Sequence, residues 1–132
     1  MTGPLDGYRV LELTTTVSGP MAAMMLADQG AEVIKIEAPM GDASRYARGR
    51  GNETPEGTIG PQFVAVNRGK RSVCLDAGTE AGMSVLHRLL ENADVFLTNL
   101  TVPSNWRDCP AIVLKFSSKL STASVCNALQ AR

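Results

Sequence analysis

The sequence lacks several features, and each absence excludes a class of protein. Lysine and arginine together number 13, as do aspartate and glutamate, so the formal net charge at pH 7 is zero. Nonspecific nucleic-acid binding requires a surplus of positive charge, so we expect no nucleic-acid partner. No apolar run approaches the roughly 18 residues of a membrane-spanning helix, so we expect no membrane association. The N-terminal segment has neither the basic patch nor the apolar stretch of a signal peptide, which predicts a cytoplasmic location.

Histidine and cysteine are also scarce. The chain has one histidine, His87, and three cysteines, Cys74, Cys109 and Cys126. Their spacing matches neither a zinc motif nor a C-x-x-C redox pair, so we predict no metal site. We expect the cysteines to be reduced and partly buried. A Ser-His-Asp enzyme would depend on His87, which lies within a predicted helix far from any nucleophile motif, so we set that class aside.

Common nucleotide-binding and nucleophile motifs are missing as well. Only Gly19 and Gly30 stand where a G-x-G-x-x-G fingerprint would lie, which disfavours an ordinary NAD or FAD site. The sequence contains no Walker motif, metal-binding helix motif or nucleophile elbow. What is present is a globular composition, 44% hydrophobic and 20% charged. A chain of 132 residues is long enough for one core and too short for two ordinary domains.

The chain alternates between strand-like and helix-like segments. Residues 8–13 and 32–37 are apolar, strand-like runs, and between them Gly19-Pro20 opens a predicted helix that ends before Gly30. A strand–helix–strand unit of this kind predicts parallel pairing with a right-handed crossover. Further segments predict strands at 72–76, 94–98 and 112–116, and a helix from Thr79 to about Asn92. The fold class is therefore α/β, a Rossmann-like parallel sheet with flanking helices.

Residues 38–66 are rich in glycine and proline and predict a long loop, in which one short helical turn can occur. Residues 99–132 lose the alternating pattern. No glycine occurs after Gly82, and Asp108 is the only acidic residue after Asp94. We therefore divide the chain into a Rossmann-like region, 1–99, and an atypical tail, 100–132, that is partly ordered at most.

Two segments could carry chemistry. The turn from Thr14 to Ser18 offers hydroxyl groups at the start of a helix, whose free N–H groups can bind an anion. The second segment is a basic set suited to phosphate, which comprises Arg45, Arg48, Arg50, Arg68, Lys70 and Arg71. Each also has an ordinary explanation, a ligand-free βα turn for the first and a solvated loop for the second. If both bind the phosphates of one ligand, they must lie on the same side of the molecule.

Four motifs resemble the start of class III CoA-transferases, the CaiB/BaiF family, which includes formyl-CoA transferase, carnitine CoA-transferases and α-methylacyl-CoA racemase. They are L-D-G-Y-R-V-L-E-L with the following S-G-P at residues 5–20, L-A-D-Q-G-A-E-V-I-K-I-E at 26–37, N-R-G-K-R-S-V-C-L-D at 67–76 and A-D-V-F-L-T-N at 93–99. The motifs occur in the family's order over most of the chain.

The resemblance implies that the ligand is an acyl-CoA thioester, bound as substrate rather than as a resident cofactor. It assigns coenzyme A contacts to Val17, Ser18, Leu75, Asn99, Leu100 and Arg107. From the basic set, we expect Lys70 and Arg71 to contact the phosphates of the same ligand. An arginine expected directly after Glu37 is replaced by Ala38. Val17 stands where transferases often have glutamine, so the subfamily stays open.

In the family, CoA moves to a carboxylic acid acceptor through a catalytic aspartate, and two subunits interlock as a homodimer. The resemblance places that aspartate beyond Arg132, so we assign no catalytic residue and expect the chain alone not to turn over. Three alternatives stay open. The chain is a fragment of a transferase, a fragment of an α-methylacyl-CoA racemase-like enzyme, or a non-catalytic CoA-binding or assembly module.

Overall fold

The computed structural model describes residues 3–47 and 58–100 and the backbone of 112–115. Within these residues the elements follow in the order β1 (Arg9–Leu13), α1 (Ser18–Asp28), β2 (Glu32–Glu37), the 3₁₀ turn η1 (Ala43–Arg45), α2 (Pro61–Asn67), β3 (Arg71–Cys74), α3 (Glu80–Leu90), β4 (Val95–Thr98) and β5 (Ile112–Lys115). All neighbouring strands run parallel, in the order β3-β2-β1-β4-β5. This agrees with the doubly wound order of Rossmann-like sheets and confirms the predicted fold class.

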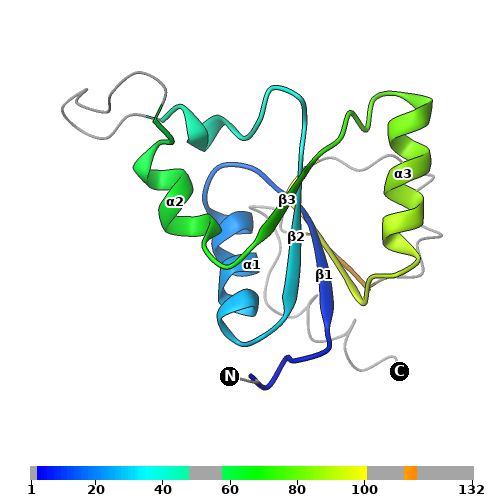
Figure 1. Cartoon of the computed structure of the whole chain (residues 1–132), viewed down its shortest axis with the longest axis horizontal. Helices are drawn as coiled ribbons and strands as arrows, with labels where there is room; N and C mark the ends of the chain where they lie inside the picture. The colour runs from blue at the N-terminus through cyan, green and yellow to red at the C-terminus, as the bar shows by residue number, and fades with distance from the viewer. Residues whose placement is uncertain (1–2, 48–57, 101–111, 116–132) are drawn as a thin grey trace.

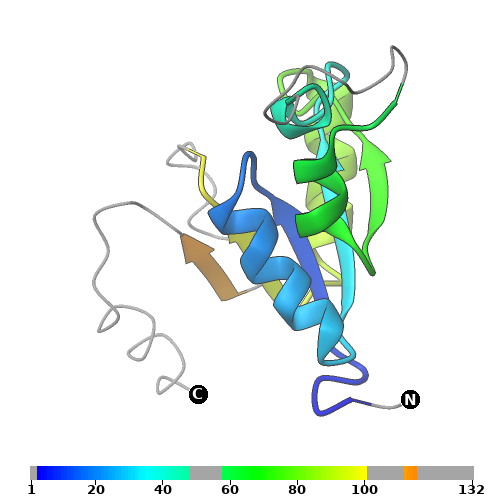
Figure 2. The ribbon, with the colours of Figure 1, turned by 90° about the vertical axis from the view of Figure 1, so that its left-hand side faces the viewer.

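Different helices cover the two faces of the sheet (Figure 1). Because side chains alternate along a strand, Val10 faces α1 whereas Leu11 faces α3. The α1 side is packed by Val10, Ala23, Ala31, Val33 and Leu97. The α3 side is packed by Leu11, Ile36, Leu86, Leu90 and Phe96. Figure 2 looks at the α1 side and shows α1 and α2 in front of the strands with α3 behind them.

The predicted loop over residues 38–66 was wrong in its last part, because α2 begins at Pro61. Proline fits the first turn of a helix, and Gly69, with φ of +75°, follows the helix end. Gly60 lies so close to η1 that an added Cβ would stand 2.7 Å from the Ser44 carbonyl oxygen. Gly60 and Pro61, two of the residues that predicted a loop, therefore mark the start of a short helix that packs against a 3₁₀ turn.

The remaining predicted elements are present with shifted ends. Helix α1 begins at Ser18, so Pro20 is its third residue, and the possible strand at 112–116 is confirmed as β5. Cys74 is reduced but exposed, so its predicted partial burial was wrong. It stands on β3, the edge strand of the described sheet, which pairs with β2 on one side only among the described residues. Cys109 and Cys126 lie outside the described residues.

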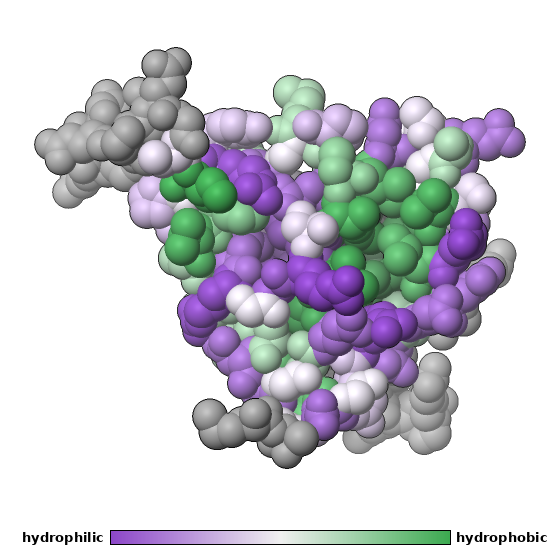
Figure 3. All heavy atoms as spheres, in the orientation of Figure 1, coloured by the Kyte–Doolittle hydropathy of each residue, from purple (hydrophilic) through white to green (hydrophobic). Residues whose placement is uncertain are grey.

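The α3 side of the sheet is only partly closed. Figure 3 shows apolar side chains reaching the surface between β3 and α3. The partly buried residues that pack against this core are Leu13, Ile34, Val73, Leu75, Ala77, Met83, Leu89 and Ala93. In the part of the chain that is described, no helix is long and apolar enough to cross a membrane.

Candidate functional site

The strand order reverses between β1 and β4, and two segments meet at the carboxyl edge of the sheet there. The turn from Thr14 to Val17 leaves β1 and enters α1, and Asn99 follows β4. In open parallel sheets ligands bind outside the carboxyl ends of the strands at such a reversal. This edge is therefore the candidate site.

Asn99 joins the two segments. Its side-chain Nδ2 donates to the Thr15 carbonyl oxygen at 3.0 Å, and its Oδ1 accepts from the Thr15 N–H at 3.1 Å. Below it, the Thr98 hydroxyl donates to the Leu13 carbonyl oxygen at 3.0 Å. Thr98 and Asn99, at the end of β4, thus hold the backbone of Leu13 and Thr15 before and within the turn.

Among the residues that the structure describes, no side chain caps the N–H groups at the start of α1. Val17 is the N-cap residue and provides no side-chain acceptor, and the first turn contains no acidic residue. Ser18 is exposed. An added Cβ on Gly19 would stand 2.5 Å from the Thr14 Cβ, so only glycine lets the turn fold this closely onto the helix. Helix N–H groups without an internal partner favour a bound anion.

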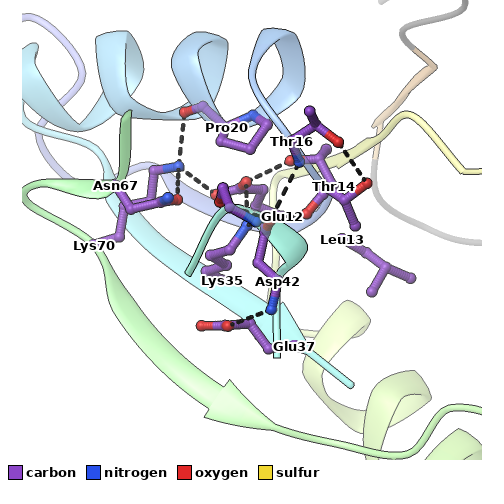
Figure 4. Close-up of polar contacts among 12 residues, drawn as sticks. Glu12, Leu13, Thr14, Thr16, Pro20, Lys35, Glu37, Asp42, Asn67 and Lys70 are labelled. Atoms are coloured by element: carbon purple, nitrogen blue, oxygen red, sulfur yellow. Dashed lines mark hydrogen bonds and ion pairs between the residues drawn. The ribbon is translucent and has the colours of Figure 1, made fainter. Parts of the chain in front are cut away.

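A cluster of buried charges lies beneath this turn, on the α1 side of the sheet (Figure 4). Glu12 of β1 and Lys35 of β2 are neighbours in the strand register, and their side chains are 0% and 1% exposed. The Lys35 Nζ lies 3.1 Å from Glu12 Oε1 and 2.9 Å from Asp42 Oδ2, and it donates to the Thr14 carbonyl oxygen at 3.0 Å. Burial of these charges is tolerable because each one has an opposite partner.

Lys70 completes the cluster from the junction of α2 and β3. Its Nζ lies 2.7 Å from Glu12 Oε2 and donates to the Pro20 carbonyl oxygen at 2.7 Å and to Asn67 Oδ1 at 2.8 Å. Burial lowers the pKa of Lys70 below its usual value, and the Glu12 carboxylate opposes that shift. The lysine therefore ties the first turn of α1 to β1.

An arginine also holds a carboxylate at the end of β2, that of Glu37. Arg45 contacts both oxygens of Glu37 at 2.7 Å, and the Ser72 hydroxyl donates to Glu37 at 2.7 Å. Hydrogen bonds from Arg45 lower the pKa of Glu37 to about 2, despite burial. Arg45 also lies over the Phe63 ring, 3.8 Å from its centroid, so η1, α2 and β2 are fastened together here.

The model of CoA-transferase family III matches residues 5–107. The chain belongs to this family. Succinyl-CoA:mesaconate CoA-transferase of Haloarcula hispanica is 44% identical over 97 residues, which cover 74% of this chain and 24% of the relative. A probable fatty acyl-CoA transferase of Mycobacterium tuberculosis is 46% identical over 94 residues, which cover 71% and 23%.

Solved structures of the family agree in fold. A CaiB/BaiF family protein from Brucella suis has a TM-score of 0.66 at 38% identity and covers 76% of this chain and 26% of its own. A Mycobacterium tuberculosis structure has a TM-score of 0.68 at 40% identity and covers 82% and 29%. The chain spans about a quarter of the length of the curated relatives that it matches.

The structure of this CoA-transferase family III chain brings some of the expected site residues together. Val17 and Ser18 are exposed at the start of α1, and Asn99 and Leu100 lie across from them after β4. Leu75 follows β3 at the same edge of the sheet, but its side chain packs on the α3 side.

The expected basic residues are separated. Lys70 reaches the first turn of α1, but its ammonium group is already paired. Arg71 points to the opposite face of the sheet and pairs with Glu32, at the start of β2, at 2.8 Å. Arg68 pairs with Asp28 at the far end of α1. Arg48, Arg50 and Arg107 lie outside the described residues. Of the described basic set, only Lys70 lies beside the turn, and Arg45 binds Glu37 at the end of β2.

Sequence reasoning missed the buried cluster of Glu12, Lys35 and Asp42. A signal for it was present, because inner strands of a parallel sheet are usually almost continuously apolar. Glu12 and Lys35 each interrupt such a run, in V-L-E-L and V-I-K-I-E. Charges at these positions predict a buried ion pair near the strand ends.

Proposed function

We propose that this chain binds the coenzyme A moiety of an acyl-CoA thioester at the carboxyl edge between β1 and β4. In the whole protein, this edge would present the thioester for transfer of CoA between carboxylic acids. The relatives named above act, by their names, on different acyl groups, so the acyl group and the acceptor acid are left open.

The observation that carries this proposal is the uncapped N-terminus of α1 at the reversal of strand order. Val17 supplies no cap, the first turn has no acid, and Asn99 holds the preceding backbone in place. Coenzyme A carries a pyrophosphate and a 3′-phosphate, and oriented helix N–H groups favour such groups without requiring a free lysine or arginine. Membership of the family supports coenzyme A as the source of this anion.

The buried acids near this edge do not suit nucleophilic catalysis. Glu12 and Asp42 are paired with lysines, and Glu37 is paired with Arg45. A carboxylate held in such pairs is neither exposed to substrate nor free to form an acyl anhydride. We therefore propose that residues 1–99 form a binding region and that residues 100–132 form an atypical tail that adds β5 to its sheet. We also propose that the 132-residue chain alone does not turn over.

Isothermal titration calorimetry of the purified chain tests the binding proposal. We expect coenzyme A to bind, and dephospho-CoA to bind more weakly if the 3′-phosphate is also contacted. The Arg71→Ala variant is the positional control, because Arg71 lies on the opposite face. It should retain the wild-type affinity within about twofold. No heat with either ligand would overturn the proposal.

A transferase assay with several acyl-CoA donors and acid acceptors tests the second part. We expect no turnover above background from the chain alone. Measurable CoA transfer would overturn the proposed inactivity and leave the binding proposal standing.

A further inference from the structure

Thr16, in the centre of the turn, has an unusual backbone conformation. Its φ is +75°, and it is the only non-glycine residue in the described part of the chain with a positive φ. The left-handed region is rare for β-branched residues because the Cβ crowds the backbone. The surrounding structure must therefore hold Thr16 in this conformation.

Asp42 provides that support from a different segment. Its Oδ1 accepts a hydrogen bond from the Thr16 N–H at 3.3 Å. The same oxygen accepts from the N–H and the hydroxyl of Ser44, at 2.9 Å and 2.7 Å. The other oxygen lies 2.9 Å from the Lys35 Nζ.

Asp42 is itself fixed and hidden from solvent. Its side chain is 1% exposed, and its N–H donates to Glu37 Oε2 at 3.1 Å. The buried Asp42 carboxylate points toward the turn from beneath, as Figure 4 shows, and Thr16 itself is exposed. Asp42 can therefore influence a ligand at the edge only through the backbone that it holds.

We propose that Asp42 is a positioning residue for the coenzyme A site, which holds Thr16 in its left-handed conformation and so aims the first N–H groups of α1 at the ligand. Lys35 and Asn99 support the adjoining residues, through the Thr14 carbonyl and both backbone groups of Thr15. Strained residues held in this way concentrate at binding sites, where they arrange the site before the ligand arrives. The proposal rests on the proposed function.

The experiment compares the wild-type chain, three Asp42 variants and one control variant by calorimetry with coenzyme A, and by thermal unfolding. Asp42→Ala removes the acceptor for Thr16 and should weaken binding about tenfold, the ratio expected when a left-handed residue loses its support. Asp42→Asn retains an Oδ1 acceptor but loses the charge facing Lys35. It should therefore lower the melting temperature while keeping most of the affinity.

The fourth form, Asp42→Ala with Thr16→Gly, separates positioning from general stability. Glycine adopts a positive φ without steric cost, so the second substitution should restore part of the affinity that Asp42→Ala removes. The control is Glu32→Gln, which also changes a carboxylate to an amide on or near β2 but at the opposite end of the strand. It should leave the affinity unchanged.

If the wild-type chain does not bind coenzyme A, both the proposed function and the positioning role of Asp42 are overturned. If the wild type binds and Asp42→Ala binds equally well, only the positioning role is overturned. The same holds if affinity follows melting temperature across all forms and Thr16→Gly restores nothing. Should Asp42→Ala lose its circular dichroism signal, Asp42→Asn with and without Thr16→Gly provides the same comparison, and an affinity gain from the glycine again supports the role.

Discussion

The side-chain amide of Asn99 pairs with both backbone groups of Thr15, although the two residues are 84 positions apart in the chain. The two hydrogen bonds resemble those between paired residues of neighbouring strands, but a side chain beyond the end of β4 makes them. It fixes the start of the turn at the reversal of strand order. An amide is required because one group must donate and the other must accept.

Asn99→Ala should therefore destabilise the fold by about 1–3 kcal/mol, because two partly buried backbone groups lose their partners. We also expect weaker binding of coenzyme A, since the turn is less fixed. Chemical denaturation and calorimetry measure the two effects. Asn92→Ala is the matched control, because the Asn92 side-chain amide makes an exposed hydrogen bond, to the Arg88 carbonyl oxygen at the end of α3. Equal effects of the two substitutions would contradict a special role for Asn99.

Lys70 makes a different prediction, because its ammonium group is buried between Glu12, Asn67 and Pro20. Lys70→Met should cost about 3–5 kcal/mol of unfolding free energy, since the Glu12 carboxylate loses one of its two lysine partners. The double variant, Lys70→Met with Glu12→Gln, should lose less unfolding free energy than the sum of the two single variants, because the two residues interact directly.

Arg68→Ala is the control for this comparison. It removes an ion pair with Asp28 that is about half exposed on both sides, and such pairs contribute less than about 1 kcal/mol. Additive effects of Lys70→Met and Glu12→Gln would show that the buried pair is not coupled as its geometry indicates.

The sequence predicts the strands and α1 correctly because their signals are local. The run V-L-E-L and the later run V-I-K-I-E are long enough to identify β1 and β2, and the Gly-Pro pair marks the start of α1 to within two residues. The same reasoning fails for α2, because its N-cap residue Gly60 and its first residue Pro61 resemble loop residues. The close packing of Gly60 on η1 explains why a glycine stands at this position.

The site is less predictable because its contacts are distant in sequence. Lys70 and Arg71 are adjacent in the chain, yet strand alternation sends them to opposite faces, one to Glu12 and the other to Glu32. Local charge counts treat the two residues as one basic segment. Asp42 lies in a glycine-rich stretch, and nothing in its neighbourhood indicates a contact with Thr16.

Glu37 predicts how stability depends on pH. Its pKa in the folded chain is about 2, below the usual value of 4.5, because Arg45 favours the charged form. The carboxylate thus contributes stability that is fully present above about pH 4.5 and is lost as the pH falls toward 2. The difference between these two pKa values corresponds to roughly 3 kcal/mol of unfolding free energy.

Denaturation series between pH 7 and pH 2 should therefore show wild-type stability falling more steeply than that of Glu37→Gln. Other carboxylates titrate in both proteins, so the difference between the two curves isolates Glu37. Parallel curves would mean that the Arg45–Glu37 pair does not stabilise the fold.

An acidic substitution of Val17, at the uncapped start of α1, should change stability and coenzyme A affinity in opposite directions. Val17→Asp supplies the missing N-cap acceptor, and such a cap should stabilise the fold by about 1 kcal/mol. The new carboxylate would occupy the position proposed for a phosphate and repel it, so affinity for coenzyme A should fall by about tenfold or more. Val17→Ser is the control, because it caps the helix without adding charge and should stabilise the fold while binding nearly as well as wild type. If Val17→Asp binds coenzyme A as tightly as Val17→Ser, the phosphate does not lie at the start of α1.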